Sequence, residues 1–346
     1  MDKQQLNAFT EQQLTDLMKE MGQPAFRAKQ IFRWLHQKQI SDFSEMTDQP
    51  KSLLEQLEQK FTLAKLVPIR RQQSKDGTIK FLFQLPDGNC IETVLMRYNY
   101  GNTVCVSTQV GCRMGCRFCA STQAGLVRCL TAGEIAAEIY AAAQDIGERI
   151  SHIVLMGIGE PLDNFDNVID FLSIISSPMG VNIGMRNISL STCGIVPMID
   201  KLAEKKLQLT LSISLHAPND AMRSKMMPVN NAYPVKELIS ACRRYQKQTG
   251  RRISFEYSMV KGVNDSAQTA NELEALIRGM GAHVNLIPIN PVDGSPYSAT
   301  DAANVKRFQK QLEQLGVNAT IRRRLGSDIS AACGQLRREA REDAVK

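Results

Sequence analysis

Three cysteines at CxxxCxxC spacing are the residues best suited to chemistry in this chain of 346 residues. Cys112, Cys116 and Cys119 lie in one short segment, and three thiolates on one loop can hold three irons of a [4Fe-4S] cluster. An electron-transfer ferredoxin supplies four cysteines per cluster, and none follows here at ferredoxin spacing. One iron would therefore keep an open position where a small molecule can bind and react, as a catalytic zinc does. A zinc site is the competing interpretation, but zinc cysteines usually come as two CxxC pairs.

Composition and charge narrow the class of protein. Nine cysteines, an odd number, indicate a reducing compartment where thiols serve metals or redox chemistry. No stretch approaches the roughly 20 apolar residues that span a bilayer, and the polar start has no signal-peptide core, so we expect a cytoplasmic protein with no membrane partner. Residues 61–130 carry nine Lys or Arg against three Asp or Glu. This basic segment around the cysteine loop favours nucleic acid as the partner, with a solvated basic face as the alternative.

From residue 103 onward, short apolar strands alternate with amphipathic segments of helical length. Strands are expected at 104–107, 153–156, 188–191, 209–215, 253–259 and 284–289, and helices at 132–144, 235–248 and 269–280. Six such units predict a parallel sheet, either doubly wound or curled into a barrel, whose active site lies at the carboxyl ends of the strands. Polar or glycine-rich segments follow five of the six strands, at 112–119, 157–161, 191–194, 214–216 and 290–291.

Two further parts precede this region and one follows it. Residues 1–62 are polar and helical in pattern, with apolar residues at helical spacing in 28–35. Residues 63–102 contain two strand-like runs, 80–85 and 90–95, around the turn sequence Pro-Asp-Gly-Asn. Thr131 and Glu134 form a predicted capping box for the helix after the cysteine loop. We therefore divide the chain into residues 1–62, 63–102, 103–300 and 301–346.

Four motifs together resemble the RlmN/Cfr family, radical S-adenosylmethionine enzymes that methylate an adenine of large-subunit ribosomal RNA. The motifs are the cysteine run 112–119, MGIGEPL at 156–162, SLHAP at 214–218 and ISAACGQL at 329–336. The resemblance extends from about residue 20 to residue 338. It implies an α/β fold, a partial (β/α)6 TIM-like radical SAM barrel with an N-terminal helical domain and a small β-hairpin extension.

The resemblance also implies a role for each matching residue. Cys112, Cys116 and Cys119 would ligate the [4Fe-4S] cluster. Cys333 would be the methyl carrier, Cys105 its redox partner, and Glu92 matches the position of the proton acceptor. The contacts to S-adenosylmethionine would be Gly159, Glu160, Ser191, Ser214, Leu215, His216 and Asn290. Among these, a carboxylate such as Glu160 is suited to bind the amino group of the methionine moiety.

The implied reaction uses two molecules of S-adenosylmethionine per turnover. One methylates the Cys333 thiolate by displacement. The other, bound to the cluster and cleaved by one electron from a donor such as flavodoxin or ferredoxin, gives a 5′-deoxyadenosyl radical that removes hydrogen from the S-methyl group. The resulting carbon radical adds to carbon 2 of adenine, which is too electron-poor to attack a sulfonium. Glu92 and Cys105 are both candidates for the base that removes the ring proton. Cys105 then attacks the Cys333 sulfur, leaving a disulfide that must be reduced.

Other functions remain in competition. Pro161 is similar to the carbon-2 subgroup, whereas the carbon-8 resistance subgroup has Ala at that position, so we expect carbon-2 methylation of 23S rRNA, with tRNA as a second candidate substrate. An iron-sulfur RNA-binding or electron-transfer protein would need neither Cys105 nor Cys333. A radical activase of a protein glycyl site would not need the basic segment. We interpret Cys90, Cys129, Cys193 and Cys242 as structural, and Arg322, Arg323 and Arg324 as either an RNA-facing stripe or a solvated strand edge.

Overall fold

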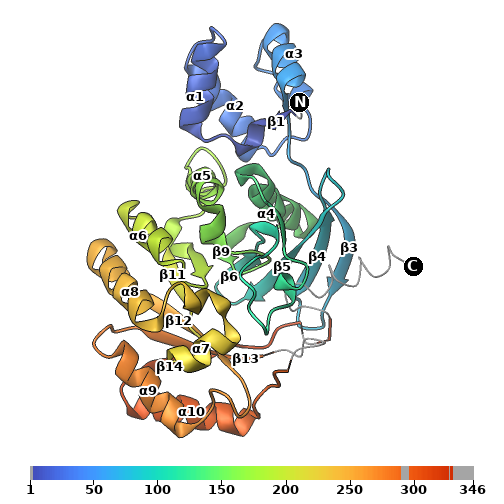
Figure 1. The fold of residues 1–346 in the computed structure, drawn as a ribbon. Helices are drawn as coiled ribbons and strands as arrows, with labels where there is room; N and C mark the ends of the chain where they lie inside the picture. Colours follow the sequence, from blue (N-terminus) through green and yellow to red (C-terminus); the bar gives the residue numbers. More distant parts are fainter. Residues whose placement is uncertain (1–2, 290–295, 327, 330–346) are drawn as a thin grey trace.

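A mixed sheet of ten strands organises the chain (Figure 1). The computed structural model describes residues 3–289, 296–326 and 328–329. The strand order is β14-β13-β12-β11-β10-β9-β6-β5-β4-β3, so strands that follow one another along the chain also lie side by side. The parallel strands are β6 (Gly101–Cys105), β9 (Ile150–Leu155), β10 (Ile188–Thr192), β11 (Thr210–Ser214), β12 (Ile253–Met259), β13 (His283–Pro288) and β14 (Asn318–Ile321).

All six expected parallel strands are present, and β14 adds one that the sequence did not reveal. Within the described ranges β14 and β3 are the two free edges of the sheet, so it is an open, partial barrel rather than a closed one. None of the helices in these ranges is long and apolar enough to cross a bilayer. The helices of this part are α4 (Ala132–Ile146), α5 (Phe165–Ser176), α6 (Val196–Glu204), α7 (Asp220–Met226), α8 (Val235–Thr249), α9 (Ala267–Ile277) and α10 (Ala302–Gln314).

Alternation along the strands separates an apolar outer face from a polar inner face. In β11, Leu211 and Ile213 belong to the main hydrophobic core, while Ser214 lines an internal cavity. In β12, Phe255 and Tyr257 are core residues, whereas Glu256 and Ser258 line the cavity. Because side chains of a strand point alternately to the two faces, the helices cover the apolar face and the polar residues face inward.

The predicted hairpin extends the same sheet. Strands β4 (Ile79–Gln84) and β5 (Cys90–Tyr98) pair antiparallel around the predicted turn, and β3 (Val67–Gln73) forms the edge beyond them. Strand β5 in turn pairs antiparallel with β6, with Val94 opposite Cys105. One face of this extension packs into the main core through Phe81, Phe83 and Leu95, and the other carries a separate cluster of Val94, Met96 and Cys105.

The N-terminal helices pack against the main part of the chain (Figure 1). They are α1 (Glu11–Glu20), α2 (Phe26–His36) and α3 (Lys51–Lys60), with the short parallel strands β1 (Gln4–Gln5) and β2 (Phe61–Thr62). The expected apolar face of α2 is confirmed, since Ala28, Ile31, Phe32 and Leu35 are buried. These residues belong to the same hydrophobic core as the residues of α4 and the sheet.

A buried histidine joins the N-terminal helices to α4. The Nδ1 atom of His36 lies 2.9 Å from the hydroxyl of Tyr140, and burial lowers the pKa of His36 from 6.5 to about 3. The unfolded chain therefore binds a proton below pH 6.5 that the folded chain excludes until about pH 3. We expect acidification below pH 6.5 to lower the free energy of unfolding by about 1.4 kcal/mol per pH unit through this residue.

Urea unfolding at pH 7.5 and pH 5.5 measures this effect. His36→Gln keeps a polar partner for Tyr140 but cannot titrate, so the wild type should lose about 1.4 kcal/mol more than the variant between the two pH values. Contributions from other titrating groups are common to both chains and cancel. Equal losses in the two chains would contradict the prediction.

Candidate active site

A cavity of about 230 Å³ lies at the carboxyl ends of the parallel strands. It brings together most of the residues that the sequence singled out, from four separate segments of the chain. Those lining it are Cys112, Cys116, Cys119, Gly159, Glu160, Ser191, Ser214 and His216. The parallel strands lie side by side and end at the same edge of the sheet. Residues more than a hundred positions apart in the sequence therefore converge on one cavity.

The three cysteines lie on a loop between two short antiparallel strands, β7 (Gln109–Gly111) and β8 (Leu126–Cys129). The sequence did not reveal this hairpin. The loop is folded by its own hydrogen bonds: the Thr122 hydroxyl donates to the carbonyl oxygens of Cys116, at 3.2 Å, and Cys119, at 3.0 Å. The backbone N–H of Cys112 donates to the carbonyl oxygen of Gly125 at 3.0 Å. The three sulfurs are thus held on one local scaffold.

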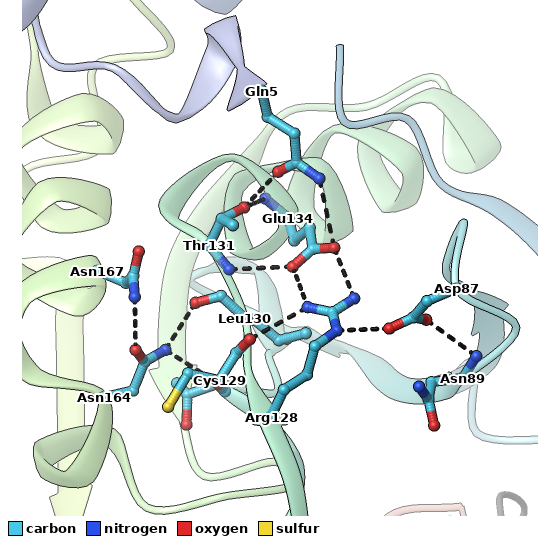
Figure 2. A network of polar contacts seen from close by, with 11 residues as sticks. Gln5, Asp87, Asn89, Arg128, Cys129, Leu130, Thr131, Glu134, Asn164 and Asn167 are labelled. Atoms are coloured by element: carbon cyan, nitrogen blue, oxygen red, sulfur yellow. Dashed lines mark hydrogen bonds and ion pairs between the residues drawn. The ribbon is translucent and has the colours of Figure 1, made fainter. Parts of the chain in front are cut away.

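A network of charged and polar side chains fixes the base of this loop (Figure 2). Arg128 on β8 forms ion pairs with Glu134, 2.8 Å away at the start of α4, and with Asp87 in the β4–β5 turn. The predicted capping box of Thr131 and Glu134 is present, and Gln5 of β1 donates to Glu134 as well. The N-terminal strand, the hairpin extension and α4 therefore all anchor the end of the cysteine loop.

The donor set fits an iron-sulfur cluster better than a single metal ion. Among the described residues, no three His, Cys, Asp or Glu side chains converge closely enough to ligate one ion. A [4Fe-4S] cluster needs no such convergence, because each cysteine binds a different iron. Burial, with a smaller contribution from the neighbouring Glu160 and Cys119, raises the pKa of the Cys112 thiol to about 12. A buried thiol of this kind gives up its proton when a cation takes the proton's place.

The turn after β9 sets the position of the cysteine loop relative to the strands. The backbone N–H of Gly157 donates to the carbonyl oxygen of Val106 at 3.0 Å, and a Cβ on Gly157 would lie only 2.5 Å from that oxygen. Gly159 has φ +110°, and its Cβ would lie 2.7 Å from Gln109. Only glycine allows this close approach of two backbones at both positions. The Gly-x-Gly spacing is therefore required by the close packing of the two backbones, and both glycines also line the cavity.

Glu160 presents a buried carboxylate to the cavity. Its Oε1 accepts a hydrogen bond from the backbone N–H of Leu162 at 3.0 Å, and its Oε2 accepts one from that of Cys193 at 2.7 Å. Burial raises the pKa of Glu160, while these hydrogen bonds act in the opposite direction. The two N–H groups fix both oxygens in place, and the remaining lone pairs of the carboxylate are available to an ammonium group in the cavity.

His216 is held as a neutral hydrogen-bond donor. Its Nδ1 accepts a hydrogen bond from the backbone N–H of Ser258 at 2.9 Å, so the proton of the neutral ring is on Nε2. Burial first, and then Arg223, lower its pKa from 6.5 to about 3. The ring of Phe118, which belongs to the cysteine loop, meets the His216 ring edge-on at a centroid distance of 4.9 Å. The cysteine loop and the end of β11 are thereby in direct contact.

Several cavity residues escaped the sequence interpretation. Glu256 and Ser258 line the cavity although no motif marked them, and Thr192 and Arg322 line it although neither was expected as a site residue. The signal for Glu256 and Ser258 is the alternation of polar and apolar residues along β12, which the sequence does show. Cys193, interpreted as structural, also lines the cavity. Arg322 follows β14 and extends toward the Met156 sulfur at 3.9 Å, so it faces inward rather than forming a solvated edge.

Three other expected site residues do not line the cavity, and two are outside the described residues. Leu215 is fully buried in the main core, so its side chain does not line the cavity. Glu92 on β5 and Cys105 on the neighbouring β6 are buried on the inner face of the sheet, and Met156 both packs against the Cys105 cluster and lines the cavity. Asn290 and Cys333 are outside the described residues. No disulfide joins any two of the described cysteines, so the structure gives no support to a disulfide; the expected partner of Cys105, Cys333, is outside the described residues.

Comparison with known proteins agrees with this geometry. Residues 106–273 match the Radical SAM superfamily, and residues 4–63 match the Ribosomal RNA large subunit methyltransferase N-terminal domain. A probable dual-specificity RNA methyltransferase RlmN from Lysinibacillus sphaericus (strain C3-41) is 52% identical over 347 residues, which cover 99% of this chain and 91% of the relative. The chain belongs to the RlmN family. An RlmN relative from Clostridium perfringens (strain 13 / Type A) is 52% identical over 95% of both chains.

The fold of this RlmN family member is also that of a solved relative. A radical SAM methyltransferase from Sphaerobacter thermophilus superposes with a TM-score of 0.90 at 46% identity, covering 96% of this chain and 98% of that one. The chain is thus a radical SAM RNA methyltransferase, and the family implies a [4Fe-4S] cluster and S-adenosylmethionine as its cofactors. The expected fold class is confirmed.

Proposed function

We propose that this enzyme methylates carbon 2 of an adenine in 23S rRNA through an S-methylcysteine on Cys333. The observation that carries the proposal is the convergence of the cysteine loop and Glu160 on one cavity, with Met156 linking that cavity to Cys105. This arrangement supplies a cluster site, an ammonium site and a second thiol within one continuous region. An iron-sulfur protein that only transfers electrons would need the first of these and neither of the others.

The chain would bind its cofactors with residues already placed around the cavity. Cys112, Cys116 and Cys119 would ligate the cluster, and Glu160 with the backbone at Gly159 would hold the amino group of S-adenosylmethionine. The neutral His216, with its proton on Nε2, would donate a hydrogen bond to the cofactor, as would the hydroxyls of Ser191 and Ser214, which lie 3.5 Å apart. The resemblance adds Asn290, and the backbone of Leu215, to these contacts.

When bound, the cluster and S-adenosylmethionine would supply a radical able to remove a hydrogen atom. A residue of the chain itself, Cys333, would carry the methyl group to the adenine. The Cys333 thiolate would first take a methyl group from one S-adenosylmethionine by displacement, and a second molecule would be consumed in activating that S-methyl group. After the carbon has joined the adenine ring, the ring would lose its proton and would return the unpaired electron to the bound cluster. Attack of the Cys105 thiolate on the Cys333 sulfur would then form a disulfide and break the sulfur–carbon bond, and the released carbon would take up a proton to become the methyl group.

Two buried groups are candidates for the base that removes the ring proton. Glu92 is 3% exposed and Cys105 is 5% exposed, and both side chains lie on the inner face of the sheet. The register places Val94 directly opposite Cys105 and Glu92 two residues along the same strand, so the two candidates are near neighbours. We assign removal of the ring proton to Glu92, because Cys105 is then available as the thiolate that attacks the Cys333 sulfur.

The finer assignments belong to the same proposal. Pro161 favours carbon 2 over carbon 8. The relatives are named dual-specificity RNA methyltransferases, which is consistent with a second RNA substrate, and the family resemblance makes tRNA the one to test. The electron donor would be a flavodoxin or ferredoxin, and the protein would work in the cytoplasm. We also propose the four-part division at 1–62, 63–102, 103–300 and 301–346.

Mass spectrometry of the purified chain tests the function directly. The chain would be reconstituted anaerobically with iron and sulfide, incubated with S-adenosylmethionine and digested. We expect one additional methyl group on the peptide that contains Cys333, and methylation at carbon 2 when 23S rRNA is added. An unmodified Cys333 in a chain with an intact cluster would contradict the proposal.

A further inference from the structure

Lys80 is a lysine with no exposed surface. It lies on β4, and its Nζ is 3.0 Å from the Oε2 atom of Glu92 on β5; the two side chains are 0% and 3% exposed. The surface pair of Arg97 and Glu148, at 42% and 49% exposed, shows the more usual setting of an ion pair in this chain. Lysine is almost never fully buried unless it is paired, so the Lys80 contact needs a reason.

Burial makes the two charges of this pair depend on each other. An isolated ammonium or carboxylate in a protein interior loses its charge, because the desolvation cost exceeds what the surroundings return. At 3.0 Å each charge compensates the other. Buried ion pairs contribute little net stability compared with apolar residues of the same volume. Stability alone is therefore a weak explanation for placing Lys80 here.

The ion pair lies on the face of the sheet that leads to the cavity. Lys80 is opposite Val94, and Val94 is opposite Cys105, so these three side chains share a face with Glu92. Val94 and Cys105 belong to the cluster against which Met156 packs, and Met156 lines the cavity. The ammonium group is thus placed beside the two candidates for the base, on the side where the substrate would lie.

A second buried glutamate, Glu138, shows how burial in this region affects the pKa of a carboxyl group. Glu138 on α4 is fully buried on the opposite side of β5, where it contacts the Thr93 hydroxyl and accepts a hydrogen bond from the backbone N–H of Ser107 at 3.0 Å. Its Oε1 has no hydrogen-bond partner among the described residues. Burial raises the pKa of Glu138 well above its usual value. Burial in this region therefore favours the protonated form of a carboxyl group, and a protonated carboxyl group cannot accept a proton.

We propose that Lys80 is a positioning residue for Glu92: its ammonium group keeps the Glu92 carboxylate ionised and oriented, so that Glu92 can take the proton from the substrate ring. The inference rests on the function proposed above. In this step the C–H bond breaks, its electron pair stays in the ring, and the proton forms a bond to a Glu92 oxygen. Lys80 remains protonated throughout and touches neither substrate nor cofactor.

Infrared difference spectra test the charge of Glu92 without any turnover. The wild type is compared with Glu92→Gln, and Lys80→Met with the double variant, each as the full chain at pH 7. We expect the first difference to show the bands of an ionised carboxylate, and the second to show those of a carboxylic acid. An ionised Glu92 in Lys80→Met would overturn the inference. The double variant lacks both charges, so it also shows whether the chain folds without the pair.

The second measurement separates the steps of the reaction. Lys80→Met should acquire the methyl group on Cys333 as the wild type does, yet form methylated RNA at least about 100-fold more slowly, the loss expected when a general base is disabled. Because Lys80 acts through Glu92, the double variant should be no slower than Glu92→Gln alone. Lys247→Met, an exposed change on α8 outside the basic segment, is the control for loss of a lysine and should behave as the wild type.

The outcomes distinguish the inference from the function on which it rests. An inactive Glu92→Gln together with a fully active Lys80→Met would overturn the role of Lys80 and leave the function intact. Losses in the two single variants that multiply in the double variant would show a role for Lys80 independent of Glu92, which also overturns the inference. A fully active Glu92→Gln would remove the proton-acceptor assignment, and the role of Lys80 would fall with it.

Discussion

Replacing Cys116 with Ala is expected to abolish cluster binding and, with it, all cleavage of S-adenosylmethionine. The loop presents Cys112, Cys116 and Cys119 to one cavity, and a cluster that keeps an open iron has no spare protein ligand. Loss of one thiolate leaves two, which is too few to retain the cluster. Iron and sulfide content after anaerobic reconstitution, together with the yield of 5′-deoxyadenosine, measures the effect. Both should fall to background.

Cys193→Ala provides the matched control, because a fourth thiol lies in the same cavity. Cys193 is buried, lines the cavity and follows β10, and its backbone N–H donates to Glu160. It belongs to an apolar cluster against which Cys116 of the loop packs, but the CxxxCxxC spacing does not include it. We expect this variant to keep the iron content of the wild type. Loss of the cluster in Cys193→Ala would mean that a fourth cysteine closes the open iron, and it would favour an electron-transfer protein over the methyltransferase mechanism.

Local signals in the sequence were sufficient for most of the fold. The six parallel strands, the hairpin around Pro86 and the capping box of Thr131 depend on the residues of one short segment each, so their patterns can be read without the rest of the chain. The cysteine spacing is equally local, and so is the Gly-x-Gly-Glu turn after β9. These segments then meet at one cavity because parallel strands align their carboxyl ends.

The remaining features depend on register and burial, which no single segment encodes. Strand β14 is only four residues long, and its place at the sheet edge comes from pairing with β13. Lys80 and Glu92 look like two surface charges on a hairpin, and only the pairing of β4 with β5 and the packing above them show a buried ion pair. Glu256 and Arg322 come from different strands and meet at the cavity only in the folded chain.

Replacing Cys333 with Ala is expected to stop RNA methylation while leaving the earlier chemistry intact. The proposed mechanism needs this thiol to carry the methyl group, so product should fall by at least about 1,000-fold, as when an enzymatic nucleophile is removed. The loop cysteines and Glu160 are unchanged, so the cluster content and the cleavage of S-adenosylmethionine should persist. Liquid chromatography of RNA digests measures the methylated adenine, and 5′-deoxyadenosine reports the cleavage.

Cys105→Ala should fail at a later step, and this difference identifies the carrier. Cys333 would still receive its methyl group and the carbon would still join the ring, but no Cys105 thiolate would be present to attack the Cys333 sulfur. The enzyme should therefore remain covalently attached to its RNA, as a band of slow mobility in denaturing gels that nuclease removes. Cys333→Ala cannot form this band, and Cys242→Ala, a change in the buried face of α8, should behave as the wild type. A covalent adduct in Cys333→Ala would assign the carrier role to another residue, since only the carrier can link the chain to the base.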